Sequence, residues 1–206
     1  MAVTRLQAAI DVVDRADALF ALGGRAGLSP TLRDDLVRQS IVMGVGALDT
    51  WMHWTIARTD LKALSRAMRN LEVPFGTLVE MAEISVDSRR RGVLDRPLVR
   101  ARNALQERLL KMTFQSAREW DRGFELIGVR SGLSKVGAAM TPAETRTDVE
   151  KRLNSLSHRR NQISHEGDLS RKLRPQSITR NAIARTDVAA DLGWIRAFLT
   201  AADTVV

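Results

Sequence analysis

Arg160, Asn161 and His165 are the side chains in this sequence that could act together on a bound anion. An arginine keeps its positive charge and can stabilise negative charge on a phosphate, and a histidine can give or take a proton near neutral pH. Asn161 would hold a histidine or a phosphate oxygen by hydrogen bonding. His158 lies seven residues before His165 and could carry a second proton, and Asp49 could orient a site residue.

These side chains lie toward the end of a predicted helix whose start is the capping-box sequence 141–144. Arg160 falls on the apolar stripe of this helix, so its charge requires an anionic partner, for which Asp49 is a candidate. Gly167 supplies a helix end, which puts His165 in the last turn, where the helix dipole favours its protonated form. The apolar stripe consists of Val149, Leu153, Leu156 and Ile163.

The spacing of Arg160 and His165 decides whether one chain can form a site. Five steps along a helix rotate by about 500°, so the two side chains are expected to point roughly 140° apart. Two chains related by a two-fold axis would supply both residues twice to a shared cleft. The apolar helix expected to start at Ser29-Pro30 and to run through Ile56 also offers more surface than one chain is expected to cover. We therefore predict a homodimer.

The net charge of +8 is concentrated in one segment. Residues 151–185 hold nine Lys and Arg side chains against two acidic ones, a balance of +7. Such a segment predicts a polyanionic partner. The residues expected to contact RNA are Arg159, Arg171, Lys172 and Arg174.

Composition excludes several other classes of protein. The chain has no cysteine, so it has no disulfide and no thiolate zinc site, and with three histidines a metal site is not expected. It has neither a phosphate-binding glycine loop nor a dinucleotide fingerprint, and we expect no cofactor. The longest apolar stretch, residues 41–48, is too short to span a bilayer, and the N-terminus lacks a targeting pattern, so we expect a cytoplasmic protein.

The periodicity is helical along almost the whole chain. It predicts one all-α domain, residues 1–206, with five to seven helices and a basic loop at 86–96 around Arg89–Arg91. The expected helical segments begin near residues 5, 30, 74, 97, 142 and 187.

Two segments resemble the HEPN superfamily of helical proteins. Residues 158–168, with the sequence His-Arg-Arg-Asn-Gln-Ile-Ser-His-Glu-Gly-Asp, look like the RiboL-PSP type, as do residues 46–53. The resemblance implies a HEPN helical bundle that dimerises with its site at the interface. It also implies metal-independent RNA cleavage, in which the ribose 2′-hydroxyl attacks the adjacent phosphate and leaves a 2′,3′-cyclic phosphate. Arg160, Asn161 and His165 would be catalytic, in a toxin or defence effector that an antitoxin or other protein holds in check.

Other interpretations of the same residues remain open. The chain could be a non-catalytic HEPN-like module that binds RNA or nucleotides or assembles with proteins, or a helical DNA-binding regulator. Arg160 could be a structural ion-pair partner of Asp49, and His165 a capping or surface residue. His158 could be an ordinary satisfied polar group, and His53, between two tryptophans, a packed core histidine.

Overall fold

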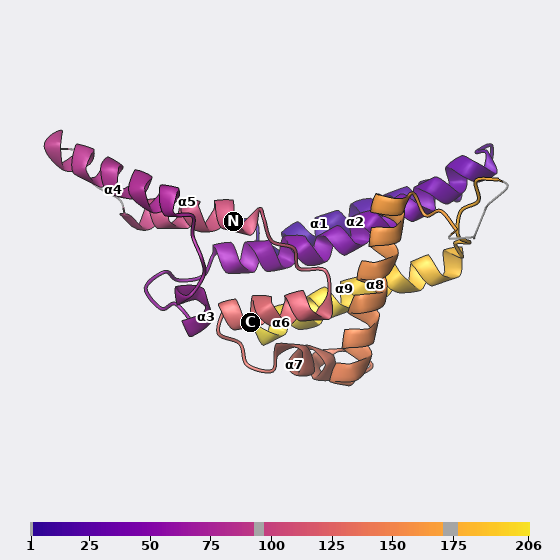
Figure 1. Cartoon of the computed structure of the whole chain (residues 1–206). Helices are drawn as coiled ribbons and strands as arrows, with labels where there is room; N and C mark the ends of the chain where they lie inside the picture. Colours follow the sequence, from indigo (N-terminus) through magenta and orange to yellow (C-terminus); the bar gives the residue numbers. More distant parts are fainter. Residues whose placement is uncertain (1, 93–96, 171–176) are drawn as a thin grey trace.

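The computed structural model describes residues 2–92, 97–170 and 177–206, and its regular elements in these ranges are α-helices (Figure 1). The described residues form a single all-α domain with nine helices. These are α1 (Arg5–Leu22), α2 (Pro30–Ala57), α3 (Arg66–Arg69), α4 (Phe75–Arg90), α5 (Pro97–Leu109), α6 (Ala117–Leu126), α7 (Gly132–Ala139), α8 (Arg146–Glu166) and α9 (Arg185–Val205).

Helix α2 lies at the centre of the fold. It begins as expected, with Ser29 as N-cap and Pro30 in the first turn, and α1, α8 and α9 pack against it. Twelve of its residues are buried, and a Cβ at Gly44 would lie 2.5 Å from a methyl carbon of Leu192, so glycine permits the close approach of α9. The expectation that the apolar surface of α2 needs a second chain to cover it is therefore wrong.

An aromatic cluster joins α2, α6 and α9 in the core. The rings of Trp51 and Trp120 stack with centroids 5.3 Å apart, and Phe198 meets Trp120 edge to face at 4.7 Å. All three side chains are fully buried. This packing fixes the body of the protein on which α8 rests.

Helix α8 runs from α7, beside its N-terminal end, to α2, against which it packs (Figure 1). Its apolar stripe is buried as the sequence predicts. The predicted start is wrong, because Thr145 caps the helix, with Oγ1 accepting from the Asp148 N–H at 3.2 Å. Glu144 lies before this cap, and its carboxylate accepts a hydrogen bond from Trp194 Nε1 on α9 at 2.9 Å.

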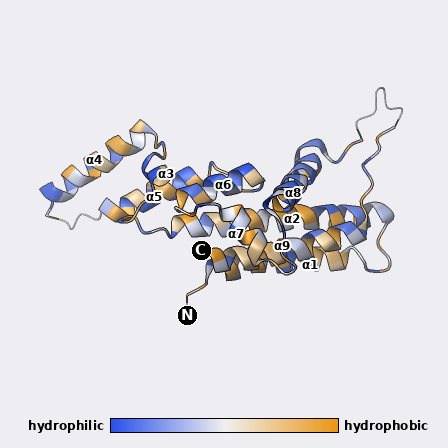
Figure 2. Ribbon diagram, turned by 90° about the horizontal axis from the view of Figure 1, so that it is seen from below, coloured by the Kyte–Doolittle hydropathy of each residue, from blue (hydrophilic) through white to orange (hydrophobic). Residues whose placement is uncertain are grey.

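The middle of the chain differs most from the prediction. The structure has nine helices in its described residues instead of five to seven. The helix expected over 97–126 is interrupted, since a capping box at Ser116 and Glu119 starts α6, and the short helices α3 and α7 were not among the expected segments. The predicted loop 86–96 is also wrong in part, since residues 86–90 complete α4. Residues 93–96 lie outside the described residues. Helices α4 and α5 form a hairpin that extends from the body (Figures 1 and 2).

Candidate functional site

The end of α8 is set by two consecutive residues in the left-handed region of backbone space. Gly167 has φ of 60° and Asp168 has φ of 56°, a conformation that glycine adopts freely and aspartate tolerates better than most residues. The Asp168 N–H donates to the Gln162 carbonyl at 2.9 Å, which closes the helix end. His165 therefore lies in the last turn, exposed, as the sequence predicts.

The three predicted catalytic residues lie together at this helix end, because Arg160 contacts the other two. Its Nη1 lies 2.9 Å from Asn161 Oδ1, to which it donates, and 3.2 Å from His165 Nε2. The expectation that one chain converges Arg160 and His165 poorly is wrong, because the long arginine side chain spans the angle between the two positions. A single chain thus presents a guanidinium, an amide and an imidazole side by side.

The guanidinium of Arg160 and the imidazole of His165 are in direct contact. Arg160 Nη1, which can only donate, lies 3.2 Å from Nε2 of the histidine. Arg160 is half-buried, and in the described part of the chain it has no carboxylate partner. Its positive charge is therefore available to an anion that approaches the end of α8.

Asp49 does not take part in this group. Its carboxylate accepts hydrogen bonds from the Phe114 N–H and from Gln115 Nε2, and His53 Nε2 lies 3.8 Å away. The suggestion that Asp49 pairs with Arg160 is wrong, because the segment before α6 already occupies both of its oxygens.

The remaining polar residues of the region have separate surroundings. His158 is exposed, seven residues before His165, which is about 10.5 Å along the helix. Asn154 Oδ1 accepts the Ala117 N–H at 3.1 Å and so anchors the start of α6 to α8. His53 packs edge to face on Phe114 and contacts the Met112 carbonyl at 3.2 Å, in line with a packed histidine.

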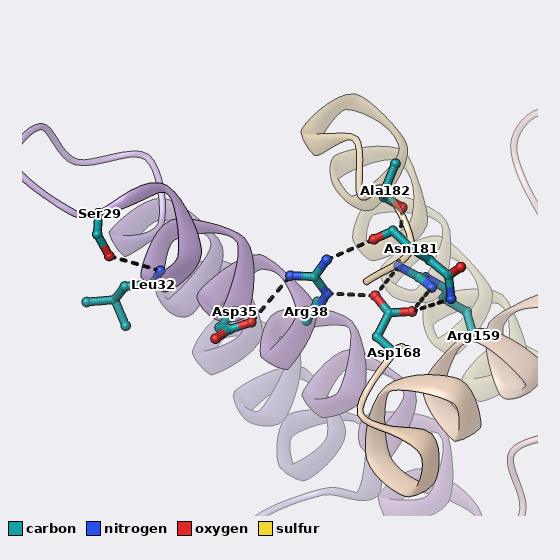
Figure 3. Close-up of polar contacts among 8 residues, drawn as sticks. All are labelled: Ser29, Leu32, Asp35, Arg38, Arg159, Asp168, Asn181 and Ala182. Carbon is teal, nitrogen blue, oxygen red and sulfur yellow. Dashed lines mark hydrogen bonds and ion pairs between the residues drawn. The ribbon is translucent and has the colours of Figure 1, made fainter. Parts of the chain in front are cut away.

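Arg159, the neighbour of Arg160, points into a buried cluster around Asp168 (Figure 3). Asp168 is fully buried, and both of its oxygens accept hydrogen bonds from Arg159. Arg38 Nε on α2 donates to Asp168 Oδ2 at 2.6 Å, and Asn181 Nδ2 donates to Oδ1 at 3.0 Å. Two guanidinium groups and an amide thus surround one carboxylate.

This cluster has a strong electrostatic preference for an ionised aspartate. Burial of Asp168 raises the pKa of its carboxyl, but the hydrogen bonds from Arg38, Arg159 and Asn181 outweigh burial, and the net pKa lies below its ordinary value. Arg38 also donates from Nη2 to the Asn181 carbonyl at 2.8 Å. The ionised carboxylate therefore ties α2, α8 and the segment before α9 to one point.

The chain after Asp168 returns to the same point before α9. The Asn181 N–H donates to the Asp168 carbonyl and the Ser170 N–H to the Thr179 carbonyl, each at 2.8 Å. Leu169 and Arg180 form an antiparallel bridge between these bonds. Of the predicted RNA contacts, Arg171, Lys172 and Arg174 lie between these paired ends and outside the described residues, whereas Arg159 is bonded to Asp168.

The sequence analysis missed the roles of Arg38 and Asn181 and did not assign one to Asp168. A signal was present for Arg38, since it stands between Val37 and Ile41 on a central apolar helix and a buried arginine requires an acid. Asp168 follows the helix-ending glycine, but nothing in the sequence pairs it with a residue 130 positions earlier.

Two further features, a membrane-crossing helix and a metal-binding group, were sought in the described residues. No helix in these ranges has the length and apolar character that crossing a membrane requires. Across residues 2–92, 97–170 and 177–206, His, Asp and Glu side chains form no group of three that could hold a metal ion.

Comparisons with protein-family models, with curated proteins and with solved structures give no significant match for this chain. The HEPN resemblance therefore rests on the motif, and function has to be argued from the site itself.

Proposed function

We propose that this chain is a metal-independent endoribonuclease of the HEPN type. The observation that carries the proposal is the contact of Arg160 Nη1 with Asn161 Oδ1 at 2.9 Å and with His165 Nε2 at 3.2 Å. An RNA phosphate at this point would meet a permanent cation, a hydrogen-bonding amide and a group that can take a proton.

The proposed reaction is an internal attack of the ribose on its own phosphate. His165 Nε2 takes the proton of the 2′-hydroxyl as the 2′-oxygen bonds to phosphorus. The bond from phosphorus to the 5′-oxygen breaks, and that oxygen leaves with a proton from solvent, so the products are a 2′,3′-cyclic phosphate and a 5′-hydroxyl. Arg160 leaves His165 to bind the charged phosphate, and Asn161 holds one of its oxygens. His158 lies about 10.5 Å from His165 along the helix, so in this proposal it contacts the RNA strand beyond the reacting phosphate.

The basic segment supports RNA as the substrate. The nine basic side chains of residues 151–185 outweigh its two acids, so a strand near the end of α8 gains attraction over several phosphates. The proposal assigns RNA binding to Arg171, Lys172 and Arg174, since Arg159 is already bonded to Asp168. An enzyme of this kind, acting as a toxin or defence effector in the cytoplasm, would need a protein partner that holds it in check.

The experiment that tests this function is cleavage of single-stranded RNA in EDTA. The wild type should cut, the cut ends should be 2′,3′-cyclic phosphates, and a substrate with 2′-deoxyribose at the cleavage position should resist because it lacks the nucleophile. A His165→Ala preparation purified in parallel controls for contaminating nuclease. Activity that EDTA removes and Mg²⁺ restores, or cleavage of the deoxy substrate, contradicts the proposal.

A second candidate function is a non-catalytic module of the same fold that assembles with other proteins. The exposed apolar side chains of the hairpin α4–α5 favour it, Phe75 being 79% exposed. This function is correct if the purified protein binds RNA or forms assemblies but cuts no RNA either in EDTA or in Mg²⁺.

A further inference from the structure

A cavity of about 610 Å³ lies between α5 and the C-terminal part of α2. In Figure 1 α5 lies beside this end of α2, which is the end away from the cluster around Asp168. Cavities of this size hold small organic molecules. The lining combines apolar side chains with a few polar ones, and none of the lining residues in the described part of the chain is acidic. The lining includes Trp54, Ala57, Arg58, Arg102, Gln106 and Leu109.

Trp54 gives this cavity an aromatic surface. It is half-buried, whereas Trp51 and Trp120 are fully buried in the core. The guanidinium of Arg58 lies over the Trp54 ring, 4.5 Å from its centroid. A planar aromatic ring bound in the cavity would bury apolar area and stack on the indole.

Arg58 and Arg102 bring two positive charges to the same cavity. Arg102 donates to the carbonyls of Ala57 and Thr59, the two neighbours of Arg58 in sequence, and Arg58 Nη2 donates to the Val3 carbonyl at 2.9 Å. These acceptors are neutral, and within the described ranges neither arginine has a carboxylate partner. The C-terminal end of a helix such as α2 offsets only about half a charge. The cavity therefore keeps a surplus of positive charge.

We infer that this cavity binds a small aromatic carboxylate, with its ring against Trp54 and its carboxylate on the guanidinium groups of Arg58 and Arg102. A guanidinium has five N–H donors, and the backbone carbonyls use one in Arg58 and two in Arg102, so donors remain for a charged acceptor. Gln106, exposed on α5, can hydrogen-bond a polar substituent of the ring. The inference goes beyond the proposed function and does not rest on it, because the cavity shares no residue with the candidate site at the end of α8.

Ligands of other chemistry fit this cavity less well. A cation would meet two arginines and no acid. A nucleotide would offer a ring and a negative charge, but its ribose hydroxyls would find no Asp or Glu of the kind that commonly binds them. The cavity of about 770 Å³ beside α7 differs, because Asp121 and Glu125 line it and Arg146 pairs with Asp121 there at 2.6 Å.

The test is a calorimetric titration of the full chain with 2-naphthoate, a bicyclic aromatic carboxylate. One molecule should bind per chain. 2-Naphthamide keeps the ring but lacks the charge, and it should bind at least about 10-fold more weakly because the charge-assisted hydrogen bonds are lost. Decalin-2-carboxylate keeps the charge but is not aromatic, and it should bind about 5-fold more weakly.

Variants of the lining residues locate the binding. Arg58→Gln should raise the dissociation constant of 2-naphthoate by about 10-fold, with an unchanged circular dichroism signal because the side chain is exposed. Arg33→Gln is the matched control and should change it by less than about 2-fold. Arg33 is also exposed on α2 and donates to a carbonyl, that of Leu28 at 3.4 Å, but it lies outside the cavity.

The aromatic contact is tested by Trp54→Leu, which keeps an apolar side chain and removes the ring. It should raise the dissociation constant by about 5-fold. The half-buried position makes a check of the fold by circular dichroism necessary. If this variant does not fold, Arg58→Gln and the two control ligands decide.

Several results would overturn the inference. They are no binding of 2-naphthoate at millimolar concentration, equal affinity for 2-naphthamide, or equal weakening by Arg58→Gln and Arg33→Gln. AMP or a short single-stranded RNA that displaces 2-naphthoate and binds more than about 10-fold more tightly would also overturn it, as evidence of a nucleotide site. These outcomes are read from heats of binding, so they are independent of whether RNA is cut.

Discussion

Arg159 and Arg160 are adjacent on α8, yet their guanidinium groups have opposite surroundings. Arg159 binds the fully buried Asp168, whereas Arg160 binds Asn161 and His165 at an exposed helix end. Adjacent residues on a helix point about 100° apart, so one faces the protein and the other faces solvent. The difference teaches that two adjacent arginines can have separate places, one in a buried ion pair and one at an exposed helix end, where the proposed function needs it to meet the phosphate.

The buried cluster around Asp168 explains the geometry of the exposed residues at the end of α8. Asp168 follows the last turn of α8 directly, and Arg38 connects it to the central helix α2. The cluster therefore fixes where α8 ends and, with it, the position of His165. The proposed function gives Arg160 no such partner, because binding a phosphate would require an accessible charge.

The largest effect should come from removing the histidine at the exposed end. His165→Ala should lower the rate of RNA cleavage by about 10²–10⁴-fold, because it removes the general base. His158→Ala is the matched control, an exposed histidine on the same helix, and should cost far less. Equal losses in the two variants would show that the histidines act together and that the site is wider than the contact with Arg160. Initial cleavage rates in EDTA measure both.

The next largest effect should be a loss of stability when the buried carboxylate of Asp168 is removed. Asp168→Ala removes the carboxylate from two buried guanidinium groups and should lower the free energy of unfolding by about 3–5 kcal/mol. Urea denaturation followed by circular dichroism measures this loss. Asp11→Ala, at an exposed carboxylate on α1, should change stability by less than about 0.5 kcal/mol. A similar small change for Asp168→Ala would mean that the cluster does not hold the fold.

Acid should reveal the same cluster through its pH dependence. Because the folded pKa of Asp168 lies below the unfolded one, its contribution to stability is complete above the unfolded pKa and is lost as the pH falls through the folded pKa. The free energy of unfolding of the wild type should therefore fall below about pH 4. Asp168→Asn should show a shallower slope in urea titrations over this range. Parallel slopes in the two proteins would contradict the lowered pKa.

A smaller effect is expected for Asn154, whose replacement should lower stability and leave RNA cleavage unchanged. Asn154→Ala removes the acceptor of the Ala117 N–H and should cost about 1 kcal/mol of stability, with cleavage per folded molecule unchanged. Asn154→Asp keeps an acceptor oxygen and should lose less. A drop in cleavage without a loss of stability would place Asn154 with Arg160 instead.

The sequence predicted the local features of the fold and missed the long-range ones. The all-α class, the N-cap of α2, the buried stripe of α8 and the stop at Gly167 follow from periodicity and neighbouring residues, and all are confirmed. Arg38, which binds Asp168, and Phe114, which binds Asp49, are far from these aspartates in sequence, and periodicity cannot pair them.

In the candidate site, too, the sequence predicted residue types better than it predicted contacts. The residue types Arg160, Asn161 and His165 could be chosen from the sequence, but their geometry could not. The angle expected between Arg160 and His165 considered only the direction in which each side chain leaves the helix. The arginine side chain is long enough to reach His165 across a turn. The ion pair of Arg159 with Asp168 was not predicted, because a charge beside a motif gives no indication of a buried acid nine residues on.

The most direct test compares Arg159→Ala and Arg160→Ala in the same two assays, urea unfolding and RNA cleavage in EDTA. Arg160→Ala should keep the stability of the wild type within about 0.5 kcal/mol and lose cleavage by about 10²–10³-fold. Arg159→Ala should lose about 3 kcal/mol or more of stability, and its folded fraction should still cut RNA. The account is contradicted if Arg160→Ala unfolds the protein, or if it cuts RNA at the rate of the wild type.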